Sequence, residues 1–221
     1  AMPREDPAQT LKILFQAERT ARSARDALAD IAQTEPDTVV ALLEQASRTA
    51  FALGDEDEGS LELVQIAELL GEMQGPRVVD LLIAILGGED PDARRAAGEA
   101  LSGLAFDRFK DVALGIERAL VRLKEGSPAL AELPYIIAEV PEPGVIKLLA
   151  RFLAHRDADA VAAAIEAAVV LGDPSVLPLL ERLAGDPRRV ELEDEGGTEG
   201  DASLGELVAE ARAILAKGGS T

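Results

Sequence analysis

The 221-residue chain contains no cysteine and no tryptophan, and it has one tyrosine and one histidine. Without cysteine it can form no disulfide, no thiolate nucleophile and no cysteine-ligated metal site. Aromatic residues make up 3% of the chain, so the core has to consist of aliphatic side chains and alanine. Small and unbranched aliphatic residues favour helices that pack closely together.

Long apolar runs and a secretory leader are also missing. No apolar run approaches the roughly 18 residues that a membrane-spanning helix requires. The first residues, AMPREDPAQT, lack the charged-then-apolar pattern of a signal peptide. Together with the absence of cysteine, these features predict a cytoplasmic protein that makes no contact with a membrane.

Basic residues are scarce. The chain has 22 lysines and arginines and 41 acidic residues, which gives a formal net charge of −19. Such a field repels phosphate backbones and anionic lipid surfaces, so neither nucleic acid nor membrane is an expected partner. It attracts basic protein surfaces or cations. The same charge also serves solubility, and the composition alone does not separate these two roles.

The segment GDPSVLPLLERLAGDP begins and ends with Gly-Asp-Pro, at 172–174 and 185–187. Glycine ends a helix because it tolerates the left-handed conformation, aspartate accepts hydrogen bonds from the next helix, and proline suits the first helical position. Each triplet therefore predicts the end of one helix and the start of another. A phosphate-binding loop would need more glycines and usually a lysine.

Turn residues of this kind divide segments whose apolar residues recur at helical spacing. No stretch alternates convincingly in the manner of a strand. The pattern predicts an all-α fold with helices near 8–33, 37–52, 61–74, 76–87, 92–105, 107–124, 128–140, 143–155, 159–171, 174–185 and 203–217.

Several of these helices repeat. Three segments align on a shared proline, Pro76, Pro143 and Pro174, followed by a valine and a Leu-Leu pair. One further unit fits between the first two, with Phe109 and Val112 in the apolar positions, which gives steps of 31 to 36 residues. A period of this length indicates stacked helical hairpins, each too small to fold alone.

Two segments carry a family resemblance, DPDARRAAGEALSGLA (90–105) and DPSVLPLLERLAGDP (173–187). They resemble the second and first helices of HEAT repeats, and they are most similar to the short bacterial type also found in phycobilisome lyases. The resemblance covers 60–185 and implies a right-handed α-solenoid of stacked hairpins, an armadillo-like superhelix. Arg94 stands where the family often carries an arginine that pairs with the turn aspartate, here Asp90.

A single domain is therefore predicted for residues 1–221. It comprises divergent N-terminal capping helices at 8–52, repeats at 60–185, an acidic loop at 186–202 and a C-terminal capping helix at 203–217. A loop of this length in a compact array is either disordered or functional.

The acidic loop partly fits a calcium-binding template. Counting from Glu191, acidic residues stand at the first, third and fifth positions and Gly196 stands at the sixth, as in an EF-hand. Ala202 occupies the twelfth position, where the template requires a bidentate glutamate. No metal site is therefore predicted.

No catalytic constellation is recognisable in the sequence. His155, the single histidine, stands at a helix end, where it can cap carbonyl groups. Ser175 and Ser203 stand at helix starts, where serine caps. Nothing resembles a catalytic triad, a P-loop or a dinucleotide fingerprint. The chain is predicted to be neither an enzyme nor the holder of a cofactor.

The candidate binding surface follows from the resemblance, because the second helices of HEAT-like arrays line the concave face that usually carries the partner. The repeat alignment places Glu68, Glu99, Tyr135 and Glu166 at one equivalent position, and Glu210 is a candidate extension. This acidic row has one aromatic residue in its middle, and tyrosine is a common interface anchor. The alternative is that glutamate belongs to the repeat itself at this position and that Tyr135 packs internally.

The first helix differs in charge from the segment that follows it. Arg19, Arg22 and Arg25 recur every three residues and form a basic strip that can meet an acidic surface of this chain or of a partner. The stretch LKILFQA (11–17) supplies apolar residues that would cap the stack or mediate dimerisation.

The leading functional hypothesis is a non-catalytic scaffold or adaptor that presents an acidic concave surface to a basic or amphipathic protein segment. The resemblance also allows a bilin lyase or a lyase-type chaperone, which would need a tetrapyrrole pocket with basic residues for the propionates. HEAT-like DNA glycosylases are a third model, but they need a basic groove with aromatic residues.

Overall fold

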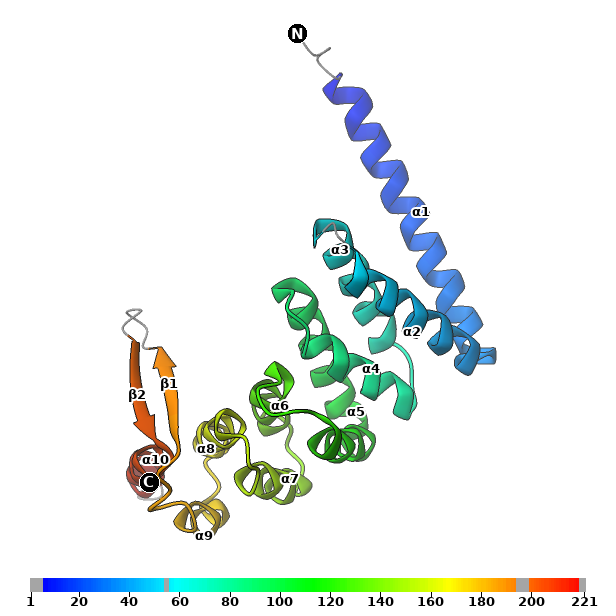
Figure 1. Ribbon diagram of the computed structural model, residues 1–221. Helices are drawn as coiled ribbons and strands as arrows, with labels where there is room; N and C mark the ends of the chain where they lie inside the picture. Colours follow the sequence, from blue (N-terminus) through cyan, green and yellow to red (C-terminus); the bar gives the residue numbers. More distant parts are fainter. Residues whose placement is uncertain (1–5, 54–55, 194–198, 219–221) are drawn as a thin grey trace.

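The structure is a computed structural model, and it describes residues 6–53, 56–193 and 199–218 (Figure 1). The described chain is mostly helical, as predicted, and each predicted helix has a counterpart. The helices are α1 (Pro7–Thr34), α2 (Pro36–Ala52), α3 (Glu56–Gly71), α4 (Pro76–Leu86), α5 (Pro91–Arg122), α6 (Pro128–Ala138), α7 (Gly144–Leu153), α8 (Ala158–Leu171), the 3-10 helix η1 (Pro174–Val176), α9 (Leu177–Glu181) and α10 (Leu204–Gly218).

Aspartate side chains begin several of these helices. Asp90, Asp157 and Asp173 each accept a hydrogen bond from a backbone N–H group of the first turn, at 2.7, 3.0 and 2.8 Å. Gly172 ends α8 with a φ of 66°, the left-handed conformation that glycine tolerates. The turn chemistry predicted for Gly-Asp-Pro is therefore confirmed at 172–174.

The long helix α5 is broken at Arg108, where φ is −147° and ψ is 53°. This break separates the two helices that the sequence predicts at 92–105 and 107–124. Beyond the break, Gly115 lies so close to α4 that a Cβ atom added to it would come 2.3 Å from Cγ1 of Val79. The second part of α5 therefore packs on α4 at a distance that only glycine permits.

Packing between helices follows the order of the predicted repeats. Gly71 of α3 lies against Ala100 of α5, and Gly98 of α5 lies near Ile136 of α6. Helix α6 packs on α8, and α8 packs on α10. Figure 1 shows the helices following one another in a curved series, with α1 projecting from one end and a β-hairpin standing at the other.

The buried apolar side chains form one continuous cluster that extends from Val39 in α2 to Ala211 in α10. Leu101, Ile137 and Phe152 are fully buried members of this cluster. Leucine, isoleucine, valine and alanine supply most of it, as the scarcity of aromatic residues predicts. Neighbouring helices therefore share one core rather than each pair having its own.

The segment predicted as an acidic loop contains two strands, so the prediction of a strand-free chain is wrong here. Strands β1 (Arg189–Glu193) and β2 (Glu199–Ser203) pair antiparallel, with Val190 opposite Ala202. Val190 is buried and Leu192 is half-buried, whereas Arg189 and Glu191 are exposed. The apolar side of this short alternation packs on the helices. Residues 194–198, which include Glu195 and Gly196 of the partial calcium template, lie outside the described residues.

The second Gly-Asp-Pro triplet precedes this hairpin and not a helix. The Asp186 carboxylate accepts hydrogen bonds from the backbone and side chain of Arg188, each at 3.0 Å. The Arg188 guanidinium also donates to the backbone carbonyls of His155 and Arg156, at 3.0 Å each. Asp186 is thus bound by the neighbouring arginine instead of capping a helix, and Arg188 ties the hairpin to the turn between α7 and α8.

The pair between Arg94 and Asp90 that the family resemblance implies is not formed. Arg94 donates instead to the Glu132 carboxylate of α6, at 2.6 Å. Asp90 accepts from the Ala93 backbone and from the hydroxyl of Ser60, the latter at 2.9 Å. The contact with α6 is available to Arg94 because α5 and α6 are packed neighbours.

Candidate functional site

The five residues of the predicted acidic row lie on helices that are packed neighbours in the order α3, α5, α6, α8 and α10. The side chains are exposed, including Tyr135 with 38% of its surface accessible. The row consists of Glu68 on α3, Glu99 on α5, Tyr135 on α6, Glu166 on α8 and Glu210 on α10.

Two members of the row have partners within the chain. Glu68 forms an ion pair with Arg25 of α1, with 3.3 Å between Oε2 and Nη2. The hydroxyl of Tyr135 donates a hydrogen bond to Oε2 of Glu166 on the next helix. The basic strip of the first helix therefore meets the acidic row through Arg25, which is one of the two outcomes that the sequence left open.

The Tyr135 hydroxyl is held in its neutral form. Partial burial of the ring and hydroxyl raises its pKa, and the hydrogen bond to the Glu166 carboxylate raises the pKa further. A neutral phenol remains a donor to Glu166, so this hydrogen bond joins one side chain of α6 to one of α8. Tyr135 is thus partly exposed, as an interface anchor would be, and partly packed within the chain. Its position lies between the two roles that the sequence suggested.

An apolar groove opens at the end of the row, between α8, α10 and the hairpin. Its volume is about 640 Å³. Val170 on α8 and Ile214 on α10 remain 69% and 48% exposed in it. The lining comprises Ile165, Glu166, Val169 and Val170 of α8, Leu192 and Gly200 of the hairpin, and Leu207, Glu210, Ala211 and Ile214 of α10.

Two carboxylates of the predicted row, Glu166 and Glu210, belong to the lining of this groove. Within the described residues neither forms an ion pair, and Glu210 has no hydrogen-bonding partner for its carboxylate. The lining includes no lysine or arginine. The groove therefore combines accessible apolar side chains with two carboxylates that form no ion pair with any lysine or arginine of the described residues.

Sequence reasoning found the two carboxylates but missed the groove that contains them. The groove exists because the hairpin brings Leu192 and Gly200 beside α8 and α10. The short alternation RVELE (189–193) is the one signal that pointed to a strand. Its charged residues made the segment read as a loop, and its strand partner lies beyond a further acidic stretch.

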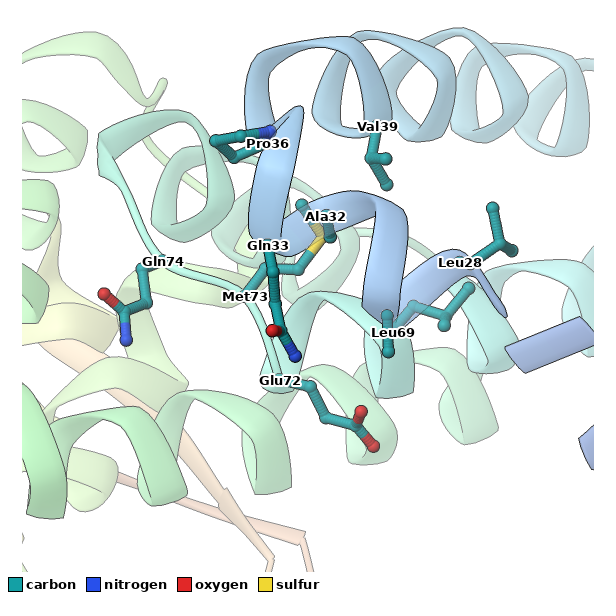
Figure 2. A pocket seen from close by; sticks show the side chains of 10 residues that line it. Leu28, Ala32, Gln33, Pro36, Val39, Leu69, Glu72, Met73 and Gln74 are labelled. Carbon is teal, nitrogen blue, oxygen red and sulfur yellow. The ribbon is translucent and has the colours of Figure 1, made fainter. Parts of the chain in front are cut away.

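A second cleft, of about 430 Å³, lies where α1 meets α2 and α3. Figure 2 shows Met73 beside Ala32 in this cleft, with the polar ends of Gln33 and Glu72 on one side. Its lining is apolar apart from a few amide and carboxyl groups, and it marks the open contact by which α1 rests on the other helices. We assign it to the attachment of α1 and not to a ligand.

A third cleft, of about 660 Å³, lies between α2, α3 and the turn before α5. Its Asp90 carboxylate is already bonded to Ser60 and to the helix that it caps. Phe51 covers part of it and lies against Gly88. The other carboxylate of the lining, Glu89, is exposed, and the cleft lies apart from the acidic row.

The residues considered for catalysis make structural contacts. Nδ1 of His155 accepts from the backbone of Asp157 at 3.1 Å, and Nε2 lies 3.3 Å from the carbonyl of Leu120. A neutral imidazole with its proton on Nε2 satisfies both contacts. Ser203 and Glu206 form a reciprocal capping box at the start of α10, with bonds of 2.7 and 3.1 Å.

The described residues contain neither a cluster of metal-ligating side chains nor a membrane-spanning helix. No group of three or more histidine, aspartate or glutamate side chains in that part of the chain is arranged to hold a metal ion. No helix there has both the length and the apolar composition needed to cross a membrane.

Comparison with known proteins adds no assignment to this site. No protein-family model, no curated protein and no solved structure matches the chain. The chemistry of the groove and of the row therefore rests on their own side chains.

Proposed function

We propose that the chain is a right-handed α-solenoid of HEAT-like hairpins and works as a non-catalytic scaffold or adaptor for a basic or amphipathic protein segment. The sequential packing of α3, α5, α6, α8 and α10 supports this architecture. So does the curvature of the helix series in Figure 1. The Arg94–Glu132 pair departs from the family pattern but still joins neighbouring units.

The single observation that carries the binding proposal is the groove between α8, α10 and the hairpin. Its exposed apolar side chains would bury an apolar anchor of the partner, at roughly 25 cal/mol for each Å² removed from water. Glu166 and Glu210 would pair with lysine or arginine beside that anchor. An amphipathic segment with basic residues next to its apolar face matches both features.

The rest of the acidic row would act mainly on the rate and orientation of binding. Glu99 is exposed and has no partner within the described residues. Long-range attraction to the net charge of −19 raises the association rate, and this effect is screened by salt over about 10 Å at 0.1 M. Glu68 is the least available member of the row, because Arg25 already neutralises it.

The test uses a designed amphipathic helical peptide with leucines on one face and lysines beside them. Fluorescence anisotropy is expected to show binding that weakens as salt rises. Glu166→Lys together with Glu210→Lys is expected to weaken binding by about tenfold or more, because both charges adjoin the apolar anchor. A peptide with glutamate in place of lysine should bind far more weakly.

The matched control is Asp107→Lys together with Glu142→Lys, two exposed carboxylates outside the groove. It changes the net charge by the same amount, so it should weaken binding only slightly. Equal losses in the two double variants would show that net charge alone attracts the peptide. In that case the groove would have no specific role.

The lyase-like alternative receives less support from the groove. A tetrapyrrole carries propionate groups, and the lining offers two carboxylates and no lysine or arginine to receive them. The DNA-glycosylase model meets the same difficulty with phosphate groups.

A further inference from the structure

An uncovered surface lies at each end of the helix series. At one end, residues 7–22 of α1 are all exposed, and Figure 1 shows this part of the helix projecting beyond its neighbours. At the other end lies the groove between α8, α10 and the hairpin. The two surfaces can be compared in apolar character, in charge and in length.

The projecting part of α1 has an apolar side. Leu14 and Phe15 follow Leu11 by three and four residues, so the three side chains lie on one side of the helix. They are 49%, 53% and 52% exposed for Leu11, Leu14 and Phe15 in turn. Because most helices owe their stability to the packing of such a side, an apolar partner would stabilise this half of α1.

Unpaired basic side chains lie beside this apolar side. Lys12 stands three residues before Phe15 and Arg19 stands four residues after it, so both are its neighbours on the helix surface. Arg22 follows Arg19 by three residues. Within the described residues none of these three forms an ion pair. Residues 7–22 contain three basic residues and one acidic residue, Glu18, so this half of α1 by itself has a net charge of +2.

The groove has the opposite charge and a matching length. Val170 and Ile214 are its exposed apolar side chains, and Glu166 and Glu210 are its carboxylates without an ion pair in the described part of the chain. Helix α10, which forms one wall, has 15 residues and extends about 22 Å at 1.5 Å per residue. Residues 7–22 extend about 24 Å by the same measure. A helix of this length and charge therefore fits the groove along its wall.

Another helix with exposed apolar and basic residues matches the groove less well. Leu114 and Val121 of α5 are exposed, but Arg118 and Arg122 beside them are paired with Asp80 of α4. These arginines are already neutralised within the chain, whereas the basic residues of the projecting part of α1 are not.

We propose that residues 7–22 of α1 in one copy of the chain occupy the groove between α8, α10 and the hairpin in a second copy. The apolar side of α1 packs on the apolar lining, and its basic side chains pair with Glu166 and Glu210. A chain cannot fill its own groove, because the other helices of the series separate it from α1 (Figure 1). The copies therefore associate head to tail. This inference rests on the function proposed for the groove and names the partner that the groove binds.

Two variants of the full chain test the inference, one for each surface. Leu11→Glu with Leu14→Glu disrupts the α1 surface, and Glu166→Lys with Glu210→Lys disrupts the groove. Light scattering over a series of rising concentrations should show a wild-type mass that increases above the 23.2 kDa of one chain. Each variant alone should keep the monomer mass.

An equal mixture of the two variants should give twice the monomer mass. One variant retains an intact α1 surface and the other retains an intact groove, so one contact can form between them. The pair cannot extend further, because both of its remaining surfaces are disrupted. A mixture that contains only monomers, or a wild-type chain that stays monomeric at every concentration, would overturn the inference.

The matched controls introduce the same charges at exposed positions elsewhere. They are Leu114→Glu with Val121→Glu, at side chains 47% and 82% exposed, and Asp107→Lys with Glu142→Lys. Both should associate as the wild type does. Loss of association in the controls to the same extent would show that the contact is not specific to α1 and the groove.

Far-UV circular dichroism checks that each variant keeps its helices. If the double variant at Leu11 and Leu14 loses helical signal, Arg19→Glu with Arg22→Glu takes its place in the mixture, because it reverses the charge and keeps the apolar side.

The designed peptide described above separates failure of this inference from failure of the proposed function. If the peptide binds in the groove but copies of the chain do not associate, the proposed function stands and the inference fails. If neither the peptide nor a second copy binds, the proposed function fails as well.

Discussion

At the scale of single residues, arginines decide how distant parts of the chain are joined. Arg188 bonds the Asp186 carboxylate and two carbonyls of the turn before α8, which lies 32 and 33 residues earlier. Arg118 reaches Asp80 of α4, and Arg94 reaches Glu132 of α6. Arginine suits these roles because its planar group offers several donors in fixed directions. These contacts depend on which helices are packed neighbours, so they cannot be predicted from the sequence alone.

Arg188→Ala is expected to lower the free energy of unfolding by about 2 kcal/mol, because the variant removes the side-chain donor of the Asp186 carboxylate and of two backbone carbonyls. Urea unfolding followed by circular dichroism measures this loss. Arg182→Ala is the control, because Arg182 is exposed and makes no ion pair within the described residues. Its effect should stay within about 0.5 kcal/mol.

The loss caused by Arg188→Ala should also depend on pH. The hydrogen bond from Arg188 lowers the pKa of Asp186 below its ordinary value of 3.8. A lowered folded-state pKa stabilises the fold above the unfolded-state value, and this contribution disappears as pH falls through the folded-state value. The difference between wild type and variant should therefore be smaller at about pH 3 than at neutral pH. A difference that is independent of pH would assign the effect to the two carbonyl contacts alone.

At the scale of elements, glycine sets how closely two helices approach. A Cβ at Gly115 of α5 would lie 2.3 Å from Val79 of α4, whereas a Cβ at Gly103 of the same helix would meet nothing within 4 Å. Both are helical positions, so alanine improves the intrinsic helix propensity at each by about 1 kcal/mol. The difference between the two substitutions therefore reports the contact between α4 and α5.

Gly103→Ala is expected to stabilise the protein by up to about 1 kcal/mol, and Gly115→Ala to destabilise it by about 1–3 kcal/mol because of the clash with Val79. Thermal unfolding of the two variants measures both effects. Stabilisation by both substitutions would mean that α4 and α5 do not approach as closely as described.

At the scale of the whole molecule, one continuous core couples helices that have no direct contact. Leu101 of α5 has no accessible surface, and α5 packs on α3, α4 and α6. A charge placed there cannot be solvated or paired within an aliphatic core. A charge at this position should therefore destabilise the neighbouring helices more than the helices at the ends of the series.

Leu101→Asp is expected to cost about 4 kcal/mol or more. Amide hydrogen exchange should show that α3, α5 and α6 lose protection more than α10 does. Leu114→Asp, at an exposed position of the same helix, is the control and should leave protection nearly unchanged. Uniform loss along the whole chain would indicate a single cooperative unit instead of a series of coupled pairs.

The sequence by itself determined the features that depend on a few neighbouring residues. Asp90, Asp157 and Asp173 cap helices because their side chains reach N–H groups two or three residues away. The break at Arg108 lies within two residues of the boundary predicted at 106, and the aliphatic core follows from composition. The repeat alignment also placed the acidic row on successive helices, because equivalent positions of similar units face the same way.

Only the tertiary structure decided the features that join residues far apart. The hairpin forms because its apolar side finds α8 and α10, and the groove exists only after it has formed. The partner of Arg94 and the open face of α1 likewise depend on where other helices end. Caps and periodicity act within one or two turns, whereas strand pairing, ion pairs and cavities depend on the relative positions of whole elements.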